Sequence, residues 1–139
     1  MRGFEDELKR SGRPSELVLR HGHAPVSFDH GAAVTPLLLE QRIDAVFAVS
    51  DLSAVGIVME CQRRGVAVPG ELSVVGFGDF EIGREINPAL TTIHVDFHAL
   101  GLRTGRLILD LLPPGGAYAP QIVDVGLTLV ERASVRGGA

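Results

Sequence analysis

Two polar dipeptides follow apolar runs of this chain and are its best candidates for binding a ligand. Ser50-Asp51 comes directly after the run 43–49, and Gly78-Asp79 comes after the run 72–77. The second run lacks clear alternation, which is typical of a strand buried on both faces of a parallel sheet. Because ligands of open parallel sheets bind beyond the carboxyl ends of the strands, both dipeptides are predicted at the rim of a pocket. Helix N-capping by Asp51 and a tight turn at Gly78-Asp79 are compatible alternatives.

The histidines and the cysteine give weaker signals for chemistry. His21 and His23 flank a glycine in a predicted loop, with His30 nearby, and two loop histidines could ligate a metal. No third ligand has the spacing of a metal site, so solvated histidines and no bound metal are expected. Cys61 lies within an apolar helical stripe, which favours core packing over a role as a nucleophile.

Motifs of common enzyme classes are not found. The chain contains neither a G-x-S-x-G nucleophile turn nor a phosphate-binding G-x-x-x-x-G-K-[S/T] loop. His94 and Asp96 alternate with apolar neighbours on a predicted strand, and we expect both to face solvent. The sequence therefore predicts a protein that is not an enzyme and has no cofactor.

Composition places the chain among soluble globular domains. Its 139 residues suit one domain, and 45% of them are apolar, which makes disorder implausible. The net charge of -4 leaves no basic stripe for binding nucleic acid. A single cysteine excludes an internal disulfide, the N-terminus has no signal peptide, and no apolar run approaches about 18 residues. A cytoplasmic protein without a membrane segment is expected.

Strands and helices alternate along most of the chain, which predicts an α/β fold with a parallel sheet. Asp29 is the expected N-cap of the second helix. The third helix carries a wider apolar stripe than one core face requires. Helices are predicted at 4–10, 31–41, 52–64 and 100–112, one helical turn within 80–87, and strands at 17–19, 43–49, 72–77, 91–95 and 121–130.

A set of landmarks between Ile43 and Ser134, with Gly3-Phe4 upstream, resembles the ligand-sensing domain of the lactose/galactose-repressor (LacI/GalR-type) family of bacterial transcription regulators. The resemblance implies a two-lobed, type I periplasmic-binding-protein-like fold with a small effector in the cleft between the lobes. Effector binding would change the angle between the lobes and so alter how a homodimer presents its DNA-binding helices. The landmarks are Ser50-Asp51, Ala54, Gly65 with Pro69, Gly76-Phe77, Pro88 with Leu90-Thr91-Thr92, and Leu129-Val130 with Arg132 and Ser134.

The same resemblance divides residues 1–139 between the two lobes of a partial effector-binding domain. Residues 1–92 and about 121–134 would form the C-terminal lobe, and about 93–120 would be a crossover segment of the N-terminal lobe. The helix-turn-helix domain and the first half of the N-terminal lobe would precede Met1. We therefore expect the apolar face of the helix at 100–112 to be exposed, swapped onto another copy or repacked.

The resemblance also assigns candidate site residues. Val26 lies where the family often has a pocket aromatic, for which Phe28 could substitute. The predicted effector-binding residues are Ser50, Asp51, Gly78, Asp79, Val95 and Phe28, and the predicted dimer-interface residues are Val55, Met59 and Ile86.

Gly78 stands where many family members have an aspartate that binds effector hydroxyls. Two like charges about 4 Å apart repel by roughly 4 kcal/mol at an effective dielectric near 20. Losing that carboxylate would therefore favour an anionic effector, and the Gly-Phe-Gly-Asp-Phe sequence is similar to that of gluconate-operon repressors. The predicted function is the effector-sensing domain of a repressor that binds a sugar or a gluconate-like sugar acid. A sugar-binding protein of an ABC transporter is the alternative.

Overall fold

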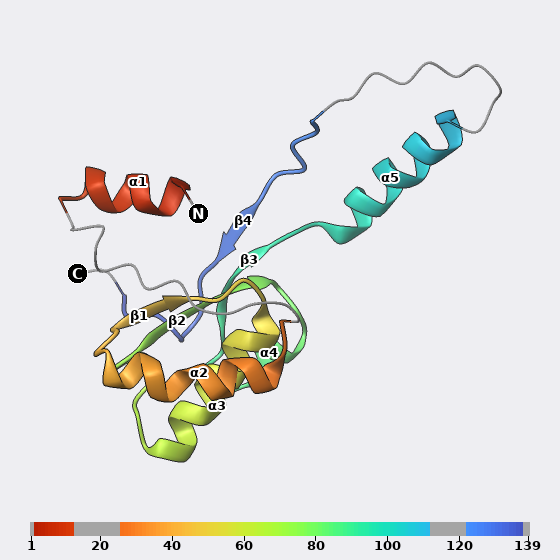
Figure 1. The fold of residues 1–139 in the computed structure, drawn as a ribbon. Helices are drawn as coiled ribbons and strands as arrows, with labels where there is room; N and C mark the ends of the chain where they lie inside the picture. Colours follow the sequence, from red (N-terminus) through yellow and green to blue (C-terminus); the bar gives the residue numbers. More distant parts are fainter. Residues whose placement is uncertain (1, 13–25, 112–121, 138–139) are drawn as a thin grey trace.

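The computed structural model describes residues 2–12, 26–111 and 122–137. The predicted strand at 17–19 and the loop with His21 and His23 lie outside these residues. In chain order the elements are α1 (Arg2–Arg10), α2 (Phe28–Glu40), β1 (Ala45–Phe47), α3 (Asp51–Arg64), β2 (Ser73–Gly78), α4 (Ile82–Glu85), β3 (Thr91–His94), α5 (Phe97–Leu111) and β4 (Thr128–Val130), as Figure 1 shows.

The described strands form one sheet in the order β1-β2-β3-β4. The first three strands are parallel, which confirms the predicted α/β class, and β4 pairs antiparallel with β3. The register places Gly78 opposite His94, so the carboxyl ends of β2 and β3 lie side by side. Among the described residues the last strand is shorter than the predicted 121–130, and the exposed Ile122 and Leu127 lie outside it.

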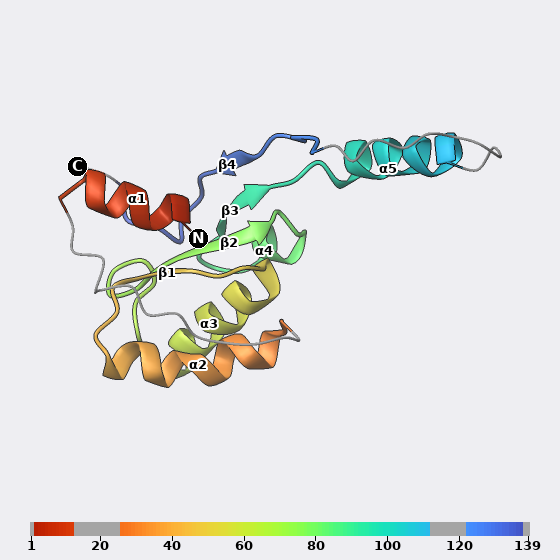
Figure 2. The same cartoon turned by 45° about the horizontal axis from the view of Figure 1, so that its top comes forward.

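Helices α2 and α3 form two successive layers on one face of the sheet, and α1 lies on the other side (Figure 2). The inner helix, α3, packs on β2. Its Val55 and Val58 meet Leu72, Val74 and Leu90 in a core where each side chain is at most 1% exposed. This core fixes the start of α3 against the end of β2.

Two glycines let α2 and α3 approach closely. A Cβ atom on Gly31 would lie 2.0 Å from the carbonyl oxygen of Ser53. One on Gly56 would lie 2.1 Å from the carbonyl oxygen of Phe28. Since real Cβ atoms do not come this close to backbone oxygens, the crossing depends on both glycines.

A serine side chain caps the N-terminus of each of these two helices. The hydroxyl oxygen of Ser50 accepts from the amide of Leu52 at 3.2 Å and is the N-cap of α3. The hydroxyl oxygen of Ser27 accepts from the amide of His30 at 3.1 Å and caps α2. The prediction of Asp29 as the N-cap is therefore wrong, because α2 begins three residues earlier than the apolar pattern indicated.

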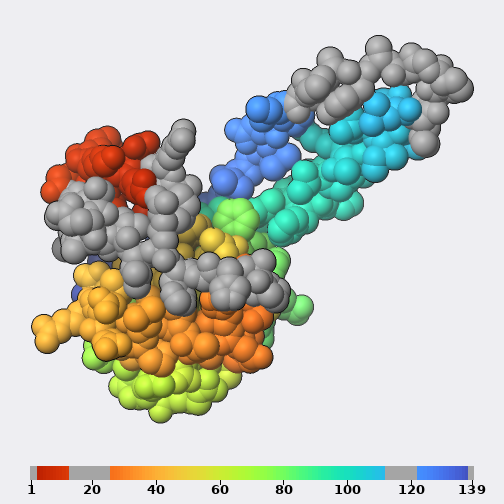
Figure 3. Space-filling view, viewed as in Figure 1, coloured from red at the N-terminus to blue at the C-terminus, as the bar shows by residue number. Residues whose placement is uncertain are grey.

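Helix α5 extends away from the body of the domain (Figure 3). None of its residues is buried, and Ile108 and Leu111 are 53% and 45% exposed. The apolar face of α5 is therefore not packed within this chain, and whether it is swapped onto another copy stays a prediction. Within the described ranges, no helix combines the length and apolarity needed to cross a membrane.

Candidate functional site

The carboxyl edge of the parallel strands brings together the two dipeptides singled out from the sequence. Ser50-Asp51 begins α3 just beyond β1, and Gly78-Asp79 ends β2. The Asp51 carboxylate accepts a hydrogen bond from the amide of Phe80 at 2.6 Å, so the two dipeptides are neighbours in space. The predicted place of both dipeptides beyond the strand ends is therefore confirmed, and the pocket that they were expected to line stays a prediction.

Asp51 is buried, and its carboxylate links the start of α3 to β3 and to the turn after β2. Its Oδ1 accepts from the hydroxyl of Thr92 on β3 at 2.6 Å, and its Oδ2 accepts from the amide of Phe80. Gly76 on β2 makes room, since a Cβ there would lie 2.1 Å from Oδ1. The residue is 0% exposed. The expectation that Asp51 contacts an effector is therefore corrected: it positions the edge and is not accessible to a ligand.

Asp79 is the centre of a charged cluster at the same edge. Its side chain is 7% exposed, and its Oδ1 accepts from the guanidinium of Arg132 at 2.5 Å. Its Oδ2 accepts from Arg84 at 3.0 Å and lies 3.1 Å from Nδ1 of His94. We call Asp79, Arg84, His94 and Arg132 the Asp79 cluster. A backbone φ of 55° at Asp79, which aspartate tolerates better than most residues, turns the carboxylate into this cluster.

Burial and the arginines act in opposite directions on Asp79. Burial raises the pKa of the Asp79 carboxyl, but the hydrogen bonds from Arg132 and Arg84 outweigh it and hold the pKa below the ordinary value of 3.8. The carboxylate is therefore ionised and paired at neutral pH.

Arg132 joins the end of the chain to the site. Its second terminal nitrogen donates to the carbonyl of Leu90 at 2.8 Å, and its amide donates to the hydroxyl of Thr91 at 2.9 Å. These contacts cross the β3–β4 pair, so the segment after β4 helps to fix the strand end that carries His94. Arg132 is one of the family landmarks in the sequence, but it was not predicted to be a site residue.

Arg84 and His94 were not predicted as site residues. His94 was expected to face solvent, and this is met in part, because 44% of the side chain is exposed while Nδ1 lies 3.1 Å from Asp79. Asp96 is exposed as expected, and its carboxylate accepts from the amide of Ala99 at the start of α5. His94 is brought to the site by its register opposite Gly78, and this register is known only once the strands are paired.

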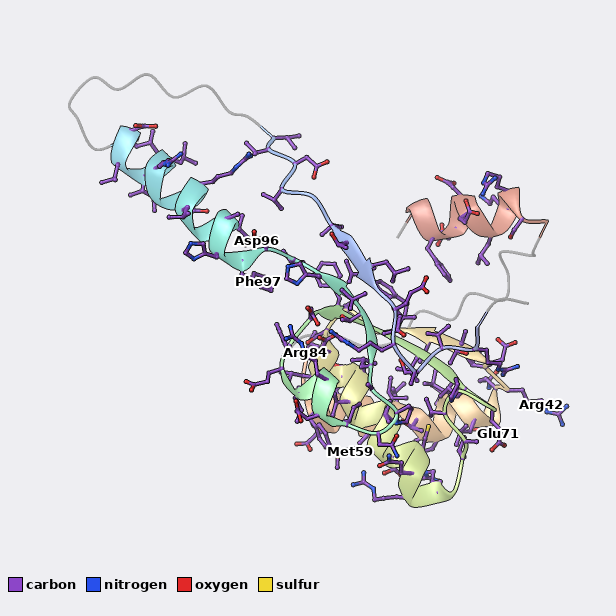
Figure 4. The ribbon with its side chains drawn as sticks, turned by 180° about the vertical axis from the view of Figure 1, so that it is seen from behind. Arg42, Met59, Glu71, Arg84, Asp96 and Phe97 are labelled. Atoms are coloured by element: carbon purple, nitrogen blue, oxygen red, sulfur yellow. The ribbon has the colours of Figure 1, made fainter. Side chains whose placement is uncertain are left out.

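Aromatic rings flank the cluster where β3 leads into α5. The ring centroids of Phe80 and Phe97 are 6.3 Å apart, and the two side chains are 37% and 52% exposed. Gly78 has a φ of 128°, and a Cβ there would lie 2.8 Å from the Phe80 ring. A side chain at position 78 would therefore strain the backbone and displace Phe80. Figure 4 shows Arg84 below the start of α5, where Asp96 and Phe97 are labelled.

The other predicted effector contacts differ in accessibility. Ser50 is half-buried at the edge, where it caps α3. Val95 is 7% exposed and offers a ligand little surface. Phe28 is half-buried and packs against the hydrophobic core, and none of its described contacts joins it to the Asp79 cluster.

The predicted dimer surface is met only in part. Met59 is 38% exposed and Ile86 is half-buried beside α4. Val55 is 1% exposed within the core, because the inner side of α3 faces the sheet. The assignment of Val55 to a dimer interface is therefore corrected.

Cys61 lies in the hydrophobic core. Burial raises the pKa of the Cys61 thiol, and Glu60 and Glu71 add to the increase. The predicted core role of Cys61 is thus confirmed, since the side chain is fully buried. In the part of the chain that the structure describes, no group of three or more His, Cys, Asp or Glu residues could hold a metal ion.

The fold is an α/β domain with a mostly parallel open sheet, and a half-exposed polar cluster lies beyond the ends of its parallel strands. Residues 1–135 match the family described as "Periplasmic binding protein-like domain". The chain belongs to this family and is a LacI-type effector-binding domain.

Named relatives agree with this assignment. The chain is 33% identical over 139 residues to "HTH-type transcriptional repressor PurR" of Edwardsiella ictaluri, covering 99% of the chain and 40% of that protein. A LacI family transcriptional regulator structure from Silicibacter pomeroyi has 36% identity and a TM-score of 0.81, with 96% of this chain and 48% of that chain covered. The structure of a LacI family transcriptional regulator from Enterococcus faecium, with bound ribose, has 25% identity and a TM-score of 0.83, and the match covers 96% of this chain and 49% of that chain.

The chain therefore spans about two-fifths of the length of this curated relative and about half of each solved chain. The named relatives are transcriptional regulators, which are not enzymes, in agreement with the motif analysis.

Proposed function

We propose that this chain is the effector-sensing part of a DNA-binding transcriptional repressor and that its effector binds beyond the carboxyl ends of β1, β2 and β3. The Asp79 cluster is the observation that carries this proposal. It presents the partly exposed guanidinium of Arg84 and imidazole of His94 beside the exposed rings of Phe80 and Phe97. Such a mixture of polar and aromatic groups suits a small hydroxylated ligand.

The proposed effector is a sugar or a gluconate-like sugar acid. A relative of the same fold holds ribose, which supports the sugar class. The carboxylates of Asp51 and Asp79 are covered, while the accessible groups of the cluster include the Arg84 cation. Within the Asp79 cluster, an exposed cation next to a covered carboxylate favours an acidic sugar over a neutral one.

Operator binding would be controlled from this site through a second lobe. We infer that residues 93–120 belong to that lobe, and the lack of any buried residue in α5 supports this division. DNA would be bound by a helix-turn-helix domain that the 139 residues do not include. The effector would act by binding one lobe arrangement more tightly than another. A cytoplasmic location follows from this role.

A second copy is the proposed protein partner. Met59 on α3 is 38% exposed, and its position is labelled in Figure 4. Helix α3 packs against α4, and Ile86, which follows α4 directly, is half-buried, whereas Val55 lies in the core. A solute-binding protein of an ABC transporter remains the second candidate for the fold, but the named relatives are regulators and favour the repressor.

Calorimetric titration of the complete gene product with D-gluconate and with D-ribose tests this function. We expect saturable binding of at least one compound, with D-gluconate the tighter. At a concentration 100 times its Kd, the bound compound should raise the free energy of unfolding by about 2.7 kcal/mol. Binding of D-ribose without D-gluconate would reject the sugar acid, and binding of neither would reject the effector class.

A further inference from the structure

Arg84 and His94 are held together by one oxygen atom. Both side chains contact Oδ2 of Asp79, at 3.0 Å and 3.1 Å. The carboxylate itself is fixed from the other side by Arg132 through Oδ1. The positions of the two exposed heads are therefore set by a buried group, which is the arrangement that preorganises a binding site.

The side chains of Arg84 and His94 remain partly accessible. The side chain of Arg84 is 54% exposed and that of His94 is 44% exposed, whereas Asp79 is 7% exposed. A guanidinium carries five N–H donors, and the contact with Asp79 uses one terminal nitrogen. Among the described residues, Asp79 is the carboxylate paired with Arg84, although Glu81 and Glu85 are exposed on the adjoining turn.

The two heads offer different chemistry to a ligand. Arg84 presents N–H donors in the fork geometry that matches a carboxylate. If His94 is neutral, donation from Nδ1 to Asp79 makes its other ring nitrogen, Nε2, an acceptor. An acceptor beside a guanidinium fits a hydroxyl group next to a carboxylate.

We propose that Arg84 and His94 together recognise a 2-hydroxycarboxylate, with Arg84 binding the carboxylate and Nε2 of His94 accepting from the 2-hydroxyl. This inference rests on the proposed function and assigns a chemical class to its effector. Asp79 and Arg132 are positioning residues in this scheme, because their contacts orient the two heads.

Titration calorimetry on the complete gene product tests the carboxylate contact with two matched probes. D-gluconate carries the 2-hydroxycarboxylate, and D-glucitol has the same carbon chain without the charge. We expect Arg84→Gln to weaken D-gluconate binding by about tenfold or more and to leave D-glucitol binding unchanged. Arg42→Gln is the control, since it removes the same charge at the opposite end of the body (Figure 4). Equal D-gluconate affinities in the two variants would overturn the proposal.

A second comparison tests the hydroxyl contact. The native protein should prefer D-gluconate over 2-deoxy-D-gluconate, and His94→Ala should abolish that preference without changing the unfolding temperature greatly. A preference retained in His94→Ala would overturn the role of Nε2. If the native protein binds D-ribose but discriminates neither pair of probes, this inference fails and the proposed function stands. If it binds none of the compounds, both fail.

Discussion

Replacing Arg132 by methionine is expected to lower the free energy of unfolding by about 3–5 kcal/mol at pH 7. The change removes the 2.5 Å bond to Asp79 and the bond to the Leu90 carbonyl, and it leaves a carboxylate that is only 7% exposed with weaker partners. The expected effect is large because the pair is mostly buried, with the side chain of Arg132 only 17% exposed. Urea denaturation followed by circular dichroism measures it.

Arg84→Met is the matched control, because Arg84 pairs with the same carboxylate from a side chain that is 54% exposed. Exposed ion pairs are worth about 0–1 kcal/mol, so this variant should be close to the native stability. Equal losses for the two variants would show that burial does not govern the cluster.

The loss in Arg132→Met should depend on pH with a definite sign. The pKa of Asp79 is below 3.8 in the folded state, so the pair stabilises the protein fully above about pH 4. That stability is lost as the pH falls through the folded-state pKa. The gap between Arg132→Met and the native protein should therefore narrow in acid, and a gap that widens would contradict the assigned pair.

Gly56→Ala is expected to lower the free energy of unfolding by about 3 kcal/mol or to prevent folding. The added Cβ would meet the carbonyl oxygen of Phe28 at 2.1 Å, and a backbone atom cannot move away as a flexible side chain can. Relief requires α2 to move off α3, which opens the core around Val55. Thermal unfolding of the purified variant gives the measurement.

Gly105→Ala on α5 is the control for Gly56→Ala. No atom lies within 4 Å of a Cβ at Gly105, so the change should be neutral or stabilise α5 by up to about 1 kcal/mol through helix propensity. Tolerance of alanine at position 56 would contradict the close crossing of α2 and α3.

Local pattern was sufficient for the sheet and for the edge that carries the site. The apolar run 72–77 and the Ser50-Asp51 and Gly78-Asp79 dipeptides follow from residue type and from where parallel strands end. The predicted boundaries of the elements were less accurate. Helix α2 begins at Phe28 because Ser27 caps it, whereas the sequence offers Asp29 as an equally plausible cap.

The partners within the site could not be obtained from pattern. Asp79 is 53 residues from Arg132 and 15 from His94, and only the strand register and the return of the chain after β4 bring them together. Val55 was misassigned because the apolar stripe of α3 does not reveal which side faces the sheet. Asp51 was misassigned because its burial depends on the missing side chain of Gly76, 25 positions away.

Amide chemical-shift mapping of the isotopically labelled complete gene product with D-gluconate tests most directly whether the carboxyl edge of β1, β2 and β3 is the effector site. We predict that the largest saturable shifts fall on Ser50, Gly78, Arg84 and His94, with none of that size on α2. Saturable shifts confined to residues away from this edge, such as the outer face of α2, would contradict it.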